Sequence, residues 1–138
     1  MTIIQVADDT FVAADPGSAS GVVGDRSRWR RWWPDLRLEV VEDRGDAGIR
    51  WQVSGPISGT MEIWCEPALD GFVLHYFLHA EPVERKSGAE AMRPDRIAEL
   101  NRRRRAAGKV MAFECKDFLE GGRGVGEPAV SVTGRTGA

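Results

Sequence analysis

The sequence has few of the residues that build metal sites, disulfide frameworks or membrane spans. Its 138 residues include two cysteines, two histidines and one tyrosine. Cys65 and Cys115 lie in unrelated segments, so we expect reduced thiols and no metal. No apolar run approaches the roughly 18–20 residues of a membrane span. Residues 1–12, which contain Asp8 and Asp9, lack the cationic start and apolar core of a signal peptide. These features predict a cytoplasmic protein.

Charge and motifs give no sign of nucleic acid or a cofactor. The formal net charge is −2, which predicts no overall attraction to nucleic acid. Four arginines fill positions 102–105, but four consecutive helical residues point in different directions, which favours a solvated face. His75 and His79 lie about 13 Å apart on a strand, too far to share a metal ion. There is no phosphate loop, nucleophile elbow or metal motif, so we expect no cofactor.

Five strands are expected. Residues 2–13 are partly β-branched and apolar, which predicts a first strand, bent or bulged where Asp8 and Asp9 interrupt the pattern. Between residues 36 and 80, apolar and polar residues alternate in four further segments, so each strand has one covered face. Turn-forming residues separate these segments, and an antiparallel meander follows from that.

Two short helices are expected after the first strand. Asp15, followed by proline, marks the start of one helix over about 16–24. Asp25 begins the second, over about 26–33, and a proline ends it. Three tryptophans share one face of the second helix: Trp29, Trp32 and Trp33. We expect at least two of these rings to pack against the end of the sheet; transient contact with a membrane surface is the alternative.

A long helix is predicted over about 95–121, between a proline and a Gly-Gly pair. One stripe of this helix contains Ile97, Leu100, Arg104, Ala107, Met111, Glu114 and Phe118, flanked by Val110 and Cys115. No other long element is available to cover the sheet, so this helix must lie across it. Residues 122–138 lack aromatic and large apolar side chains other than valines, so we expect a disordered tail.

This order of elements resembles the START-like or Bet v 1-like (SRPBCC) superfamily, and within it the actinobacterial polyketide cyclase/dehydrase and lipid-transport group. The residues that carry the resemblance are Ala14-Asp15-Pro16, then Asp25 with Trp29, Trp32, Trp33 and Pro34. The resemblance covers about residues 2–121. It implies an α+β helix-grip fold, in which a curved antiparallel sheet wraps around a long C-terminal helix, with two short helices after the first strand. The domain would span 1–121, followed by the tail at 122–138. Family members often have six strands where we expect four, so the sheet should be short.

The resemblance implies a cavity between the sheet and the long helix. We expect it to bind or carry a small hydrophobic ligand (a lipid, a polyketide or an aromatic compound) without chemistry. The expected lining is Leu38, Trp51, Val53, Met61, Ile63, Leu74, Tyr76, Arg104, Ala107, Val110 and Met111. A polyketide cyclase or dehydratase, acting through Tyr76, Arg104 and Glu114, is the alternative. A packed core without a cavity, in a small interaction module, is a third hypothesis. The sequence does not predict an oligomeric state.

Overall fold

The computed structural model describes residues 3–83, 92–124 and 126–131. Its elements are β1 (Ile4–Val12), the 3-10 turn η1 (Pro16–Ser18), α1 (Ser20–Val23), α2 (Arg26–Trp32), β2 (Arg37–Asp43), the 3-10 turn η2 (Gly45–Ala47), β3 (Gly48–Ser54), β4 (Ile57–Ala68), β5 (Gly71–Pro82) and α3 (Pro94–Leu119). The strands form one antiparallel sheet in the order β1-β5-β4-β3-β2. In the described part of the chain, four strands therefore lie between the short helices and the long one, as the sequence predicts.

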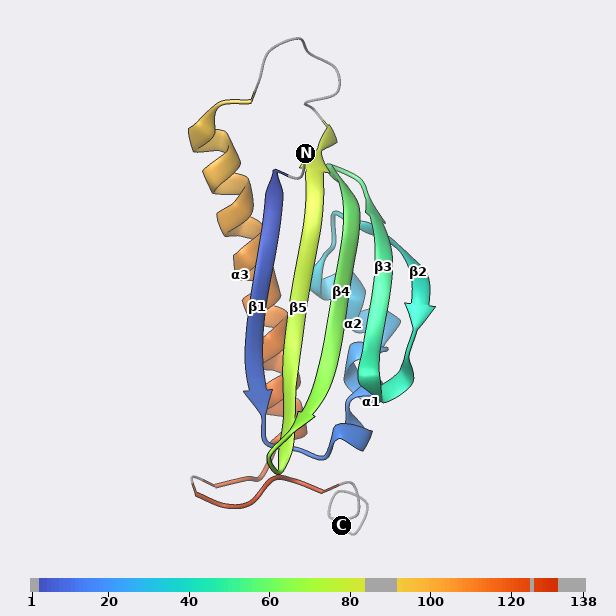
Figure 1. Ribbon diagram of the computed structural model, residues 1–138, viewed down its shortest axis with the longest axis vertical. Helices are drawn as coiled ribbons and strands as arrows, with labels where there is room; N and C mark the ends of the chain where they lie inside the picture. The colour runs from blue at the N-terminus through green and yellow to red at the C-terminus, as the bar shows by residue number, and fades with distance from the viewer. Residues whose placement is uncertain (1–2, 84–91, 125, 132–138) are drawn as a thin grey trace.

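All three helices lie on one face of the curved sheet (Figure 1). Of the strands, α3 makes most of its contacts with β1, and α1 contacts β3. Alternate residues of β5 are buried beneath the helices: Phe72, Leu74, Tyr76 and Leu78. The side chains between them point away from the helices, so the sheet has one covered face. This arrangement confirms the predicted helix-grip α+β fold.

The two predicted helix starts are confirmed by their caps. The Asp15 carboxylate accepts a hydrogen bond from the Gly17 amide at 2.8 Å, and the Asp25 carboxylate accepts one from the Ser27 amide at 3.0 Å. Each cap pairs an N–H group that the helix leaves free. The first helix is nevertheless split, because a 3-10 turn precedes the four-residue α1.

The three tryptophans of the second predicted helix are all buried. Trp29 and Trp32 are 5% exposed, and Trp33, which follows α2, is 1% exposed. The expected packing of at least two of these rings is met by all three, and the burial gives no support to the alternative of membrane contact. The rings pack inward because they are the largest apolar groups available to cover this end of the sheet.

β1 runs without the predicted bulge. Its pairing with β5 is continuous from Ile4, opposite Ala80, to Val12, opposite Phe72. Asp8 fits the regular strand because its side chain forms an ion pair with Lys109 of α3, at 2.7 Å. The irregular register lies in β2 instead, between residues 40 and 42.

α3 is rotated relative to the predicted stripe. Its buried residues are Leu100, Gly108, Met111, Ala112, Cys115 and Leu119. Val110 and Phe118 are exposed instead. At Gly108 the helix backbone lies against the sheet, and an added Cβ there would lie 2.6 Å from the Tyr76 ring. The bare backbone there lets the helix and the ring touch.

The segment after α3 returns to the start of the domain. Val130 forms a parallel bridge with Ala14. Its amide donates to the Ala13 carbonyl at 3.0 Å, and its carbonyl accepts from the Asp15 amide at 2.6 Å. The sequence predicts disorder from residue 122 onwards, and within that range the structure describes this pairing at Val130. Residues 132–138 lie outside the described part.

Glu114 ties α3 to α2. Its carboxylate accepts hydrogen bonds from Arg31 at 2.7 and 2.9 Å, and from Arg28 at 2.8 Å. The hydrogen bond from Arg31 lowers the pKa of Glu114 most, burial opposes it, and Arg28 lowers it further. The bridge holds the tryptophan-bearing α2 against α3.

Replacing Glu114 with glutamine is expected to reduce the free energy of unfolding by about 1–2 kcal/mol at neutral pH, because charge-assisted hydrogen bonds are lost at a partly exposed position. The pKa of Glu114 is lower in the folded state than that of an unperturbed glutamate, mainly because of the hydrogen bond from Arg31. The stabilisation is therefore complete above the unfolded-state pKa and is lost as the pH falls through the folded-state pKa. Urea denaturation of the original protein and of Glu114→Gln, at pH 7 and at about pH 3, measures this loss. The same difference in the free energy of unfolding at both pH values would contradict the prediction.

Candidate ligand-binding site

Aromatic rings fill the middle of the space between the sheet and the helices. Trp33 stacks on Tyr76 with ring centroids 6.1 Å apart. Trp51 meets Trp33 edge-on at 5.5 Å and Trp29 edge-on at 5.1 Å. Tyr76 in turn contacts the α3 backbone at Gly108. The large rings thus occupy the place where the sequence predicts open space beneath α3.

The aromatic cluster contains polar atoms without partners. The indole nitrogens of Trp32, Trp33 and Trp51 are buried and form no hydrogen bond within the described residues. Leaving such a donor unpaired costs about 1–3 kcal/mol. Among the described residues, the Tyr76 hydroxyl donates to the Met61 sulfur, at 3.4 Å. Burial raises the pKa of Tyr76, against a smaller opposing effect from the Trp33 indole, whose N–H falls short of hydrogen-bond geometry.

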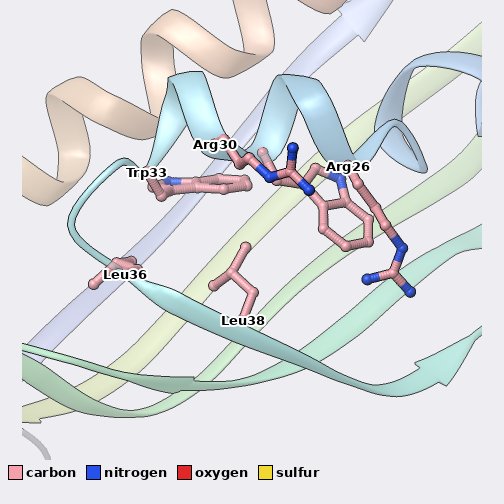
Figure 2. A pocket seen from close by; sticks show the side chains of 6 residues that line it. Arg26, Arg30, Trp33, Leu36 and Leu38 are labelled. Atoms are coloured by element: carbon pink, nitrogen blue, oxygen red, sulfur yellow. The ribbon is translucent and has the colours of Figure 1, made fainter.

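A pocket of about 240 Å³ opens beside this cluster, between α2 and β2 (Figure 2). Its lining residues are Arg26, Trp29, Arg30, Trp33, Leu36 and Leu38. In Figure 2, Trp33 and Arg30 project from the α2 side, and Leu38 projects toward them from β2. The pocket exists because β2 is the edge strand of the sheet, and α2 covers its inner face incompletely.

Two arginines frame the mouth of this pocket. Arg26 and Arg30 lie four residues apart on α2, so they share one side of the helix. The Arg26 guanidinium stands 5.1 Å above the Trp29 ring. Within the described residues, neither arginine forms a salt bridge, whereas the neighbouring Arg28 and Arg31 are both engaged by Glu114. The pocket therefore combines apolar walls with two available cations.

The structure separates the residues predicted to line a cavity. Fully buried core positions are Trp51, Val53, Met61, Ile63, Leu74, Tyr76 and Met111. Leu38 lines the pocket, and Ala107 is half-buried. Arg104 forms an ion pair with Asp35 at 2.7 Å. Val110 is 60% exposed and lines no space beneath α3, because the helix is rotated.

Sequence reasoning missed most of the pocket. Trp29 and Trp33 were noted for packing, but Arg26, Arg30 and Leu36 were not assigned to a site. The available signal was the spacing of Arg26, Trp29, Arg30 and Trp33 at i, i+3, i+4 and i+7, which places two arginines and two tryptophans on one side of the helix.

The three alternative catalytic residues do not all converge. Arg104 and Glu114 are ten residues apart on α3, which is about 15 Å along the helix. Each is already paired, Arg104 with Asp35 and Glu114 with Arg28 and Arg31. Joint acid–base action would need both within hydrogen-bond reach of one substrate.

The described residues contain no group of three or more histidine, cysteine or acidic side chains placed to hold a metal ion. Both cysteines are buried. Burial raises the pKa of Cys65 to about 12 and that of Cys115 to about 12, so both are protonated thiols at neutral pH. No described helix has the length and apolar character to cross a membrane.

The sheet, the aromatic filling and the long helix together define a helix-grip domain, and comparison with known proteins agrees. No family model and no curated protein matches the sequence. Solved structures do match. The Aha1 dimer from Colwellia psychrerythraea aligns with a TM-score of 0.58 at 14% identity, over 88% of this chain and 99% of that one.

Two polyketide cyclase-like proteins are also similar. The Polyketide_cyc-like protein Cgl2372 from Corynebacterium glutamicum has a TM-score of 0.55 at 17% identity, over 87% of this chain and 93% of that one. The di-domain ARO/CYC protein StfQ from the steffimycin biosynthetic pathway has a TM-score of 0.55 at 17% identity, over 85% of this chain. The match spans 51% of StfQ. At these identities the likeness establishes the fold alone, and it agrees with the predicted helix-grip α+β fold.

Proposed function

We propose that this protein binds a small hydrophobic acid in the pocket between α2 and β2, and that it does so without chemistry. The observation that carries the proposal is the pocket itself. Leu36, Leu38 and Trp33 supply apolar walls, and Arg26 and Arg30 stand at its edge without salt-bridge partners in the described residues. Ligand sites are typically apolar concavities with a few polar groups that fix orientation.

The size of the pocket narrows the ligand class. Its volume of about 240 Å³ lies below the roughly 300–1,000 Å³ of common ligand sites. It suits one or two fused rings better than a long acyl chain. A flat ring can lie against Trp33, since aromatic pairs favour stacked or edge-on contact. Among lipids, polyketides and aromatic compounds, a compact aromatic acid fits best.

The charge at the mouth favours an acid over a neutral compound. Guanidinium groups pair with carboxylates through two parallel hydrogen bonds. Arg26 and Arg30 are near the protein surface, so solvent screening limits the gain from such pairing. We therefore expect the carboxylate to strengthen binding about tenfold, which corresponds to about 1.4 kcal/mol.

2-Naphthoate and its neutral amide test this function. In calorimetric titrations, naphthoate should bind about tenfold more tightly than the amide. The Arg30→Glu variant should remove that preference and leave binding of the amide unchanged, because only the acid uses the cation. In NMR spectra of the backbone N–H groups, the chemical-shift changes that naphthoate causes should map to α2 and β2.

The matched control is Arg37→Glu, which makes the same charge change on the exposed start of β2, outside the pocket lining. It should alter naphthoate affinity less than about twofold, because screened surface charges interact weakly. Equal losses of naphthoate affinity in Arg30→Glu and Arg37→Glu would mean that the effect comes from the net charge of the protein and not from the pocket. The absence of any shift at α2 and β2 would refute the proposed site.

A further inference from the structure

One side of α3 carries a row of exposed residues at heptad spacing. Arg103, Ala106, Val110, Phe113 and Asp117 follow one another at steps of three, four, three and four residues, and all five are exposed. Val110 is 60% exposed and Phe113 is 51% exposed. Residues at this spacing lie in one line along a helix. We call this row the outer seam.

The outer seam has an apolar middle and oppositely charged ends. Ala106, Val110 and Phe113 form the middle, Arg103 lies toward the start of α3, and Asp117 lies toward its end. Neither Arg103 nor Asp117 forms a salt bridge within the described residues. Phe118, beside the seam, is also 49% exposed. Contiguous exposed apolar side chains on a soluble domain mark an interaction surface.

We infer that the outer seam is the contact surface of a homodimer, in which α3 helices of two copies pack antiparallel about a two-fold axis at Val110. In this register, residues seven positions before and after the axis face each other. Arg103 of each copy then meets Asp117 of the other. Phe113 lies over the small Ala106 of the second copy, which fills the space that a small residue leaves.

The pattern fits a second copy better than another partner. A two-fold contact must complement itself, because each surface meets an identical one. The outer seam does so in the antiparallel direction, where both ends gain opposite charges. A parallel pairing would place Arg103 against Arg103 and Asp117 against Asp117, which is unfavourable.

The contact is small, so the dimer should be weak. Fourteen residue steps at 1.5 Å each make the outer seam about 21 Å long. One such seam buries less than the roughly 1,200–2,000 Å² of stable complexes. We expect a dissociation constant on the order of 100 µM. The pocket between α2 and β2 lies apart from this surface, so the inference does not depend on the proposed ligand.

Sedimentation equilibrium between about 10 µM and about 1 mM protein tests the dimer. Val110→Glu places two carboxylates at the two-fold axis and should weaken association more than tenfold. The matched control is Val41→Glu, because Val41 on β2 is also 60% exposed; this change should leave association unaltered. Circular dichroism and the thermal midpoint of each variant check that folding is retained at these exposed positions.

A charge exchange tests the direction. Asp117→Arg should weaken association about tenfold, because Arg103 then faces a like charge at both ends. The double change Arg103→Asp with Asp117→Arg should restore affinity to within about threefold of the original, since opposite charges face each other again. A monomer at 1 mM, association that Val110→Glu leaves unchanged, or no effect of Asp117→Arg would each overturn the inference.

Discussion

Replacing Trp51 with alanine is expected to lower the free energy of unfolding by about 3–5 kcal/mol. Trp51 is fully buried in β3 and contacts both Trp29 and Trp33 edge-on. Its removal takes away a large apolar surface and leaves a hole that neighbouring rings cannot fill without leaving their own contacts. Urea denaturation followed by circular dichroism measures the loss.

Trp64 on the neighbouring strand β4 provides the control. It has the same side chain, but it is 38% exposed and stacks on His75, with ring centroids 4.6 Å apart. Trp64→Ala should cost about 1 kcal/mol or less, the contribution of one aromatic pair with little burial. Comparable losses from Trp51→Ala and Trp64→Ala would contradict the view that the central cluster holds the domain together.

Replacing Gly48 with alanine is expected to lower the free energy of unfolding by about 3 kcal/mol or more. Gly48 begins β3 with a backbone φ of 126°, which residues that carry a side chain rarely adopt. An added Cβ would also collide with the Ile63 carbonyl oxygen. Backbone strain and overpacking each cost about 1–3 kcal/mol. Because β3 pairs with the edge strand β2, Gly48→Ala should also shift Leu38, which lines the pocket.

The same substitution at Gly21 is expected to change the free energy of unfolding in the opposite direction. Gly21 lies in α1, and an added Cβ there would meet nothing within 4 Å. Gly21→Ala should therefore raise the free energy of unfolding by up to about 1 kcal/mol, since alanine favours the helical conformation. Denaturation curves of the two variants should move to opposite sides of the original. A stable Gly48→Ala protein would contradict the close approach of β3 and β4.

Features that depend on neighbours along the chain could be predicted from the sequence. Asp15 and Asp25 cap the helices because a carboxylate reaches an amide two residues away. The alternation in β5 correctly assigns Tyr76 to the covered face. In these cases the geometry is set within a few residues.

The orientation of α3 could not be predicted, because the helix has two apolar rows. One contains Leu100, Met111 and Cys115, and the other contains Val110 and Phe113. Periodicity shows that such rows exist but does not tell which one faces the sheet. Gly108 has no side chain to indicate burial. It is buried because the Tyr76 ring lies against the helix backbone there.

The site was missed for a related reason. Whether space remains beneath α3 depends on how far the rings of α2 reach across the sheet. Trp33 reaches Tyr76 and closes the centre, which moves the open volume to the edge beside Leu36 and Leu38. That reach is set by the angle of α2, and the angle follows from packing between segments distant in sequence.

The indole cluster also gives this protein an optical signal of its own. Four of its five tryptophans are buried, and Trp29, Trp33 and Trp51 are held at fixed mutual angles. Rigid, asymmetric coupling of this kind generates strong near-ultraviolet circular dichroism, and excitation energy can pass from ring to ring. A ligand that settles against Trp33 would therefore perturb the absorption of the whole cluster, so occupancy of the pocket can be followed without any attached label.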